Sequence, residues 1–170
     1  MPERWYPIFL DLDGKAALVV GSGAMADEKV AGLRAAGADV AVVAAADFVD
    51  GDVDGKLLVV AATDEETGAR VAAAAARAHL FCNVADVPHQ CSFILPAIHR
   101  EGPITVAVST GGASPALAQW IRARVAELVG PRHAALAERL RELRPWAKAN
   151  LPTYEQRRDY FQQLVREELG

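Results

Sequence analysis

A glycine-rich turn is the part of this sequence that most directly indicates chemistry. An apolar run at residues 18–20 leads into a Gly-x-Gly-x-x-Ala pattern, and a helix-forming segment follows at once. In a nucleotide site of this type, Gly21 permits a tight turn, Gly23 leaves room for a pyrophosphate, and Ala26 lets the helix pack closely on the strand. The helix N-terminus offers N–H groups and partial positive charge to phosphates. The alternative is an ordinary strand-to-helix turn without a ligand. The predicted site consists of Gly21, Ser22, Gly23, Ala24, Met25 and Ala26.

Alternating strand and helix signals surround this turn in the first two thirds of the chain. Thr63 and Glu66 have the spacing of a capping box, so one helix is expected to begin there. Continuous apolar strands that alternate with helices predict a mainly parallel α/β sheet covered on both faces. The predicted strands lie at about residues 15–20, 39–44, 57–62 and 80–84, and the predicted helices at about 25–36 and 63–78.

The connection at residues 45–56 is too short and too poorly patterned for a helical crossover. In the Rossmann strand order 3-2-1-4-5 the third strand lies at the edge, so it can be lost without disrupting the centre. We therefore expect a trimmed Rossmann-like sheet that lacks the usual third-strand unit. Two further strands are expected at residues 93–95 and 104–108, joined by a turn at residues 100–103.

The pattern becomes helical after residue 112. Ser114 followed by Pro115 is a favourable helix start. The helix that follows carries an apolar stripe with little chain left to bury it, so we expect a homodimer. The stripe consists of Leu117, Ile121, Val125 and Leu128. The predicted domains are a nucleotide-binding domain at residues 1–112 and a helical dimerisation and C-terminal region at residues 113–170.

Composition narrows the class of protein. With 170 residues, 52% of them hydrophobic, the chain can bury the core of one soluble domain with a modest appendage. A net charge of −4 argues against a nucleic-acid or membrane-surface role. No apolar run approaches the ~18 residues that span a bilayer. Cys82 and Cys91 are wrongly spaced for zinc, and His89 alone is no metal site, so no metal-binding residue is predicted. The cysteines are expected to be buried thiols in a reducing cytoplasm.

Five blocks of the sequence resemble one family, precorrin-2 dehydrogenase, the dehydrogenase/chelatase part of siroheme synthase. Its specific part is Asn-Val-x-Asp followed by Ser-x-Gly-Gly-x-Ser-Pro. The blocks lie at residues 6–10, 21–29, 61–64, 81–93 and 107–118. The resemblance implies NAD-dependent oxidation of precorrin-2 to sirohydrochlorin in siroheme biosynthesis, and some members of the family also insert ferrous iron.

NAD is the cofactor that the resemblance implies. Thr63 and Asp64 are expected near one of its riboses, and the matching block also places Asn83 and Val84 in the cofactor site. A carboxylate for the adenosine ribose is not evident at the end of the second strand, and Asp47 is the nearest candidate. A preference for NAD over NADP is therefore implied by the resemblance alone.

Asp86 is the catalytic carboxylate that the resemblance implies, because a proton must leave the substrate when hydride leaves for the nicotinamide. It follows a predicted strand at the end where ligands of open α/β sheets bind. The alternative is a loop aspartate that caps a turn before Pro88. Precorrin-2 carries several carboxylates, so its site needs N–H donors and cations. The predicted N–H donors come from Ser109, Thr110, Gly111, Gly112 and Ser114, and the candidate cations are His99, Arg100, Arg122 and Arg124.

Two other functions share part of this pattern. A non-catalytic NAD(H)-sensing Rossmann module would need the glycine-rich turn but not Asp86 or the Ser109–Ser114 segment. A dehydrogenase of a small hydroxy acid would usually have a larger substrate domain and a catalytic His or Lys. Whether the protein also inserts iron stays open, since that reaction asks chiefly for a base.

Overall fold

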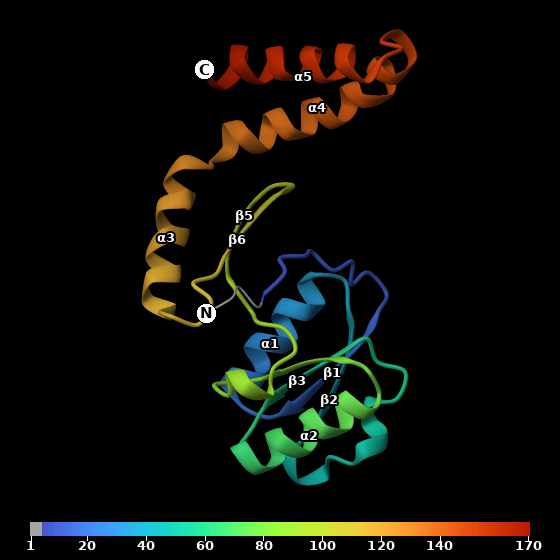
Figure 1. The fold of residues 1–170 in the computed structure, drawn as a ribbon, viewed down its shortest axis with the longest axis vertical. Helices are drawn as coiled ribbons and strands as arrows, with labels where there is room; N and C mark the ends of the chain where they lie inside the picture. The colour runs from blue at the N-terminus through green and yellow to red at the C-terminus, as the bar shows by residue number, and fades with distance from the viewer. Residues whose placement is uncertain (1–4) are drawn as a thin grey trace. The chain divides into compact units, whose positions relative to one another are not determined.

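The structure is a computed structural model that describes residues 5–170, and it contains two compact units. The units are Met1–Leu95 and Pro96–Gly170. Figure 1 shows a sheet between helices in the first unit, and a strand hairpin with three long helices in the second. Each unit is described by itself.

Four parallel strands form the centre of the first unit. They lie side by side in the order β2-β1-β3-β4. This order equals 3-2-1-4-5 without its third strand, so the predicted trimmed Rossmann-like sheet is confirmed. The strands are β1 (Ala16–Gly21), β2 (Asp39–Val43), β3 (Leu58–Ala62) and β4 (Phe81–Val84).

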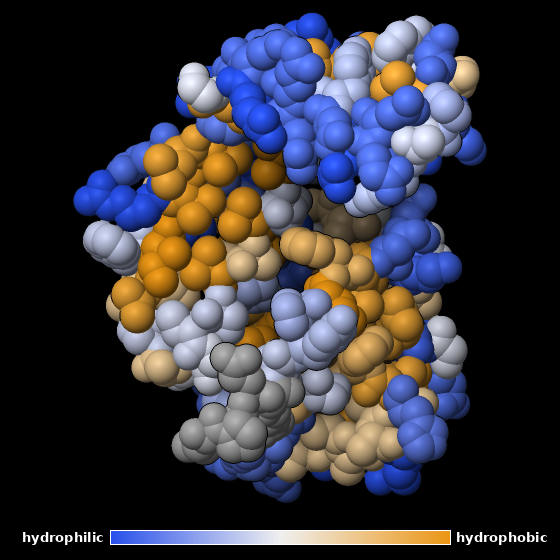
Figure 2. Space-filling view, turned by 45° about the horizontal axis from the view of Figure 1, so that its top comes forward, coloured by the Kyte–Doolittle hydropathy of each residue, from blue (hydrophilic) through white to orange (hydrophobic). Residues whose placement is uncertain are grey.

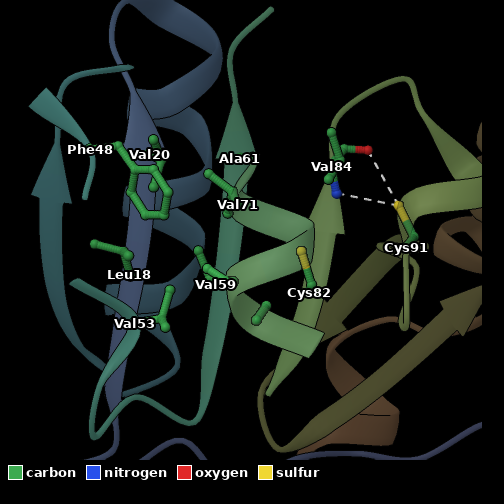
Figure 3. Packing of buried hydrophobic residues seen from close by; sticks show 12 residues of the cluster. Leu18, Val20, Phe48, Val53, Val59, Ala61, Val71, Cys82, Val84 and Cys91 are labelled. Carbon is green, nitrogen blue, oxygen red and sulfur yellow. Dashed lines mark hydrogen bonds between the residues drawn. The ribbon is translucent and has the colours of Figure 1, made fainter. Parts of the chain in front are cut away.

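One helix covers each face of the sheet, which explains the continuous apolar character of the central strands. Val19 of β1 packs with the buried side of α1 (Ala24–Ala35). Val20, on the opposite face, packs with the buried side of α2 (Glu65–Arg77). Figure 3 shows this second cluster, with Val71 of α2 over the strand residues. Successive strand residues therefore alternate between two cores, as the strand period of two requires.

The short link between β2 and β3 fills the place of a crossover helix with two short 3-10 turns, η1 (Ala45–Asp47) and η2 (Asp50–Val53). Phe48 and Val53 are each only 2% exposed and belong to the same core as α2. Arg70 of α2 donates a hydrogen bond to the Phe48 carbonyl at 3.2 Å. Two buried apolar side chains thus replace the helix that the shortened sequence lacks.

The predicted strand at residues 93–95 is wrong, because that segment is irregular. The chain instead forms an antiparallel hairpin of β5 (Ala97–Glu101) and β6 (Ile104–Val108). Gly102, with φ 53°, and Pro103 make its turn, within the predicted 100–103 region. This hairpin is a separate two-stranded sheet, and it belongs to the second compact unit. The expected domain boundary after residue 112 placed it with the parallel sheet.

Three helices follow the hairpin: α3 (Pro115–Leu128), α4 (Pro131–Asn150) and α5 (Tyr154–Leu169). The predicted start of α3 is confirmed, since Ser114 Oγ accepts a hydrogen bond from the Leu117 N–H at 3.2 Å and Pro115 is the first helical residue. Helices α4 and α5 pack together through Trp146 and Tyr160, whose ring centroids are 5.4 Å apart. Among residues 5–170, no helix is long and apolar enough to cross a membrane.

Candidate active site

The carboxyl ends of all four parallel strands meet at one edge of the sheet. The register aligns Val43, Val20, Ala61 and Val84 in one row across β2, β1, β3 and β4. The chain leaves β1 towards β2 on one side and leaves β3 towards β4 on the other. Such a reversal beside adjacent strands is where open α/β sheets bind ligands. The glycine-rich turn, Thr63 with Asp64, and Asp86 all follow this row.

The two positions of the turn, 21 and 23, require glycine for different structural reasons. Gly21 has φ 134°, and a Cβ there would lie 2.1 Å from the backbone oxygen of Ala62. This glycine therefore lets the ends of β1 and β3 approach each other. Gly23 has φ 80° and ψ −172°, and a Cβ there would meet nothing within 4 Å. Gly23 thus leaves open space, which is the room that a pyrophosphate needs.

The N-terminus of α1 is suited to an anion. Gly23 is its N-cap and provides no side-chain hydrogen bond, and no side chain among residues 5–170 accepts from the first N–H groups of the helix. Ser22 and Ala24 are exposed, as is Met25, whereas Ala26 is buried against the sheet, as predicted. Nearby, Lys29 pairs with Glu28 at 3.2 Å. The turn, its open space and this helix end together fit a dinucleotide phosphate.

Asp64, rather than Thr63, caps α2, so the predicted capping box of Thr63 with Glu66 is wrong. Asp64 Oδ1 accepts from the Thr67 backbone N–H at 2.9 Å. Its Oδ2 accepts from the hydroxyls of Thr63 and Thr67, each at 3.0 Å. These bonds, with that of the Thr67 N–H first, hold the pKa of Asp64 below its ordinary value. Both predicted ribose contacts are thus already engaged in starting the helix, and their role towards a ribose stays a prediction.

Three other predicted cofactor residues differ in their exposure at this edge of the sheet. Asp47 is exposed in η1, four residues after β2 ends. Asn83 is 9% exposed, and its amide donates to the Phe93 carbonyl at 3.0 Å. Val84 is 2% exposed and lies in the core shared with α2. The side chains of Asn83 and Val84 therefore face the protein interior, and any cofactor contact of theirs would come from the backbone.

Asp86 stands exposed two residues after β4, in the left-handed region at φ 60°. Aspartate tolerates this conformation better than most residues. The turn is closed by the backbone, with the Val87 N–H donating to the Val84 carbonyl at 3.2 Å. Within the described residues the Asp86 carboxylate has no hydrogen bond or ion pair, so it does not cap the turn. A carboxylate without a partner at this edge is available to accept a proton.

In the Ser109–Ser114 segment of the second unit, most polar groups form hydrogen bonds with one another. Thr110 Oγ1 accepts from the Ser114 N–H at 3.1 Å and donates to the Ser114 carbonyl at 3.0 Å. The Gly111 N–H donates to Ser109 Oγ at 3.1 Å. Gly111 and Gly112 have φ of 62° and 89°, a conformation that favours glycine. The predicted N–H donors for substrate are thus reduced mainly to the Gly112 backbone, and their role stays a prediction.

The candidate cations of the second unit are engaged to different degrees. Arg124 pairs with Glu127 at 2.7 Å, and Arg122 donates to the Gln119 side chain at 2.9 Å. His99 Nε2 lies 2.8 Å from the Val129 carbonyl. Arg100 is exposed on β5 and has no ion pair among residues 5–170.

Two residues outside the predicted site, Cys91 and Ser92, organise the chain around Asp86. The Cys82 N–H donates to Ser92 Oγ at 2.7 Å, and the Val84 N–H donates to Cys91 Sγ at 3.3 Å. No local pattern signals these contacts, because they depend on which side of β4 the chain returns to. Both cysteines are buried and not in a disulfide, as expected. Burial, and then the nearby Cys91, raises the pKa of Cys82 to about 11.

In the described part of the chain, no group of three or more His, Cys, Asp or Glu residues is placed so that it could hold a metal ion.

Comparisons with known proteins show what the chain as a whole is similar to. Residues 8–97 match a family described as putative NAD(P)-binding, and residues 101–128 match one described as sirohaem biosynthesis protein central. The chain is 37% identical over 181 residues to siroheme synthase of Thioalkalivibrio sulfidiphilus and 37% identical over 184 residues to that of Pseudomonas aeruginosa. These matches include 95% and 96% of this chain but only 37% and 40% of the relatives. The chain therefore spans about two fifths of the length of the curated relatives it matches.

A solved structure described as "SirC, precorrin-2 dehydrogenase" has the same fold. The TM-score is 0.73 at 21% identity, and the alignment covers 98% of this chain and 93% of that chain. Together these similarities confirm the resemblance drawn from the five sequence blocks.

Proposed function

We propose that this chain, which belongs to the putative NAD(P)-binding family through residues 8–97, uses NAD to oxidise precorrin-2 to sirohydrochlorin. The relatives named siroheme synthase support the substrate, and the family match supports the cofactor. The single observation that carries the proposal is the unpartnered carboxylate of Asp86 on the same sheet edge as the open glycine-rich turn. A module that only binds NAD(H) has no need of that carboxylate.

The turn of residues 21–26 binds the cofactor. Its open space at Gly23 admits the pyrophosphate, and the N-terminus of α1 supplies N–H donors and partial positive charge. Bound NAD supplies a hydride acceptor at C4 of its nicotinamide. No carboxylate stands at the end of β2, and Asp47 is the candidate for the adenosine ribose.

Asp86 accepts the proton. Oxidation removes a hydride from a ring carbon of precorrin-2 and a proton from the same molecule, so the products are sirohydrochlorin, NADH and H⁺. A base that takes the proton as the hydride leaves typically contributes about 10²–10⁴-fold in rate. In the Ser109–Ser114 segment the Gly112 backbone N–H, together with Arg100, binds substrate carboxylates through hydrogen bonding and positive charge.

The test compares Asp86→Asn with the parent. Asparagine keeps the size and the tolerance of left-handed φ but cannot take up the proton. We expect normal folding, normal NAD binding by calorimetry, and a loss of turnover of about 10²–10⁴-fold when precorrin-2 oxidation is followed by absorbance. Asp39→Asn is the matched control, because Asp39 is an exposed aspartate at the opposite end of the sheet. Turnover of Asp86→Asn within twofold of the parent contradicts the assignment, and NAD binding by a parent that never oxidises precorrin-2 supports a sensor instead.

Iron insertion into sirohydrochlorin is proposed as a second reaction of the same base. Metal insertion requires removal of pyrrole protons, and Asp86 is the carboxylate available for it. Adding Fe²⁺ or Co²⁺ to the parent after oxidation should change the absorption spectrum, and Asp86→Asn should slow this step as well. A chelatase rate that Asp86→Asn leaves unchanged separates the two reactions.

We also propose that the chain is a homodimer held by its second unit, and that it works in the cytoplasm, where its two buried cysteines stay reduced. Leu117, Trp120 and Leu128 of α3 are 48%, 59% and 73% exposed. Figure 2 shows hydrophobic side chains gathered at the left, where α3 lies in Figure 1, and a hydrophilic surface at the top, where α4 and α5 lie. A second copy that covers this face is the commonest solution. Light scattering that reports a monomer at micromolar concentration contradicts the dimer.

A further inference from the structure

We propose that Cys91 is a positioning residue, whose thiol holds the turn that carries Asp86 against the free edge of β4. The inference rests on the proposed role of Asp86 as the base.

The free edge of β4 has backbone groups that need partners. Within residues 5–170, β4 pairs with β3 alone, and the N–H groups of Phe81 and Ala85 donate to carbonyls on that side. The N–H groups of Cys82 and Val84 point away from β3. Ser92 is the partner of Cys82. Ser92 Oγ accepts from the Cys82 N–H at 2.7 Å, and the Ser92 N–H donates to the Cys82 carbonyl at 2.8 Å.

Cys91 forms its hydrogen bonds with Val84 through its sulfur atom. Its Sγ accepts from the Val84 N–H at 3.3 Å and lies 3.3 Å from the Val84 carbonyl and 3.4 Å from the Val87 carbonyl. The Asn83 amide approaches the same sulfur at 3.6 Å. Figure 3 shows the two contacts between Cys91 and Val84. The S–H proton is shared between the carbonyls of residues 84 and 87, so one thiol ties together both ends of the turn.

Asp86 lies between these two ties. Its φ of 60° lies in the left-handed region, which aspartate tolerates at some cost, and the surrounding contacts hold it there. The backbone bond from Val87 to Val84 closes the turn, and Cys91 anchors that closed turn to the strand edge. Removing the thiol leaves the buried Val84 N–H without its partner, which favours a shift of the turn.

Removing the Cys91 thiol should lower the rate of oxidation without weakening cofactor binding. A misplacement of a catalytic group by about 1 Å can cost about 10²-fold. We expect Cys91→Ala to lower kcat by about ten- to a hundred-fold and to leave the Kd for NAD within about twofold. Cys91→Ser, which restores an acceptor and a donor, should recover most of kcat. Cys82→Ala is the matched control: it removes a second buried thiol from the same core, and that thiol has no hydrogen bond among the described residues.

Two measurements decide the proposal. The first is a double-mutant cycle in which kcat of Asp86→Asn/Cys91→Ala equals that of Asp86→Asn alone, because a residue that acts through Asp86 has nothing further to lose. Additive losses overturn the proposal. Normal turnover in Cys91→Ala beside an impaired Asp86→Asn overturns it while leaving the role of Asp86 intact, whereas an active Asp86→Asn refutes both.

The second measurement needs no substrate. Hydrogen exchange by NMR should show at least a tenfold faster exchange of the Val84 amide in Cys91→Ala than in the parent. Cys82→Ala should leave that amide protected, and thermal melting shows that each variant is folded. Equal protection of Val84 in Cys91→Ala and the parent overturns the positioning role, whatever the enzyme assay reports.

Discussion

Replacing Gly23 with alanine separates the ligand role of the glycine-rich turn from its role in the fold. A Cβ at this position meets no protein atom within 4 Å, so the substitution causes no steric clash in the protein. The cost to the fold comes only from the backbone, whose φ of 80° and ψ of −172° fall in a region used almost only by glycine. Such a residue costs about 1–3 kcal/mol. In a protein of this size each kcal/mol lowers Tm by about 2–4 °C, so a fall of about 2–12 °C is expected.

Gly23→Ala should also weaken the binding of NAD. The added methyl group occupies the open space in front of the helix N-terminus and holds the pyrophosphate away from the backbone N–H groups. Each hydrogen bond to a charged group contributes about 1.5–3 kcal/mol. The loss of one such bond weakens the Kd by about ten- to 150-fold.

The assay is calorimetric titration with NAD, beside thermal melting of the same samples. Gly14→Ala is the control, because Gly14 also has positive φ (64°) and open space around a Cβ, but lies in the turn before β1 begins. Its Tm should fall by about 2–8 °C, from a cost of about 1–2 kcal/mol, while its Kd for NAD stays unchanged. If Gly23→Ala binds NAD as tightly as Gly14→Ala does, the cofactor site has been placed wrongly.

Further predictions concern the groups around this site. Gly21→Ala should prevent stable folding altogether, because its Cβ would lie 2.1 Å from the Ala62 carbonyl oxygen; a cooperative melt close to that of the parent refutes this. The hydrogen bonds that lower the pKa of Asp64 stabilise the fold above its ordinary value of 3.8 and are lost as pH falls through the lowered pKa. The gap in Tm between the parent and Asp64→Asn should therefore close as the pH is lowered from 7 towards 3, and a constant gap contradicts the capping role. Cys82 should resist iodoacetamide at pH 9 in the folded protein and react once urea unfolds it, because its pKa is raised from 9.0 to about 11. The raised pKa also means that its contribution to stability is complete below pH 9 and is lost as pH rises through about 11.

Features with a local cause could be predicted from the sequence by itself. Ser114 and Pro115 begin α3 as expected, because a cap needs only a hydroxyl and the next few N–H groups. The apolar runs place β1 and β3 correctly, since strands buried on both faces carry mainly apolar side chains. The missing third strand also follows from the sequence, because a short link without a helical pattern cannot cross over the sheet as a helix. The family blocks then indicate which carboxylate, Asp86, stands at the ligand-binding edge.

Other features depend on which segments meet in space. Asp64 displaces Thr63 as the cap of α2 because the end of β3 brings its carboxylate onto the Thr67 N–H. Phe93 lies in no strand, because the segment before it returns to β4 and pairs with that edge mainly through the Ser92 hydroxyl and the Cys91 thiol. Hydrogen-bond partners of this kind are set by the path of the chain and not by the spacing of residues along it. For that reason the tertiary structure alone decided how the turn of Asp86 is held.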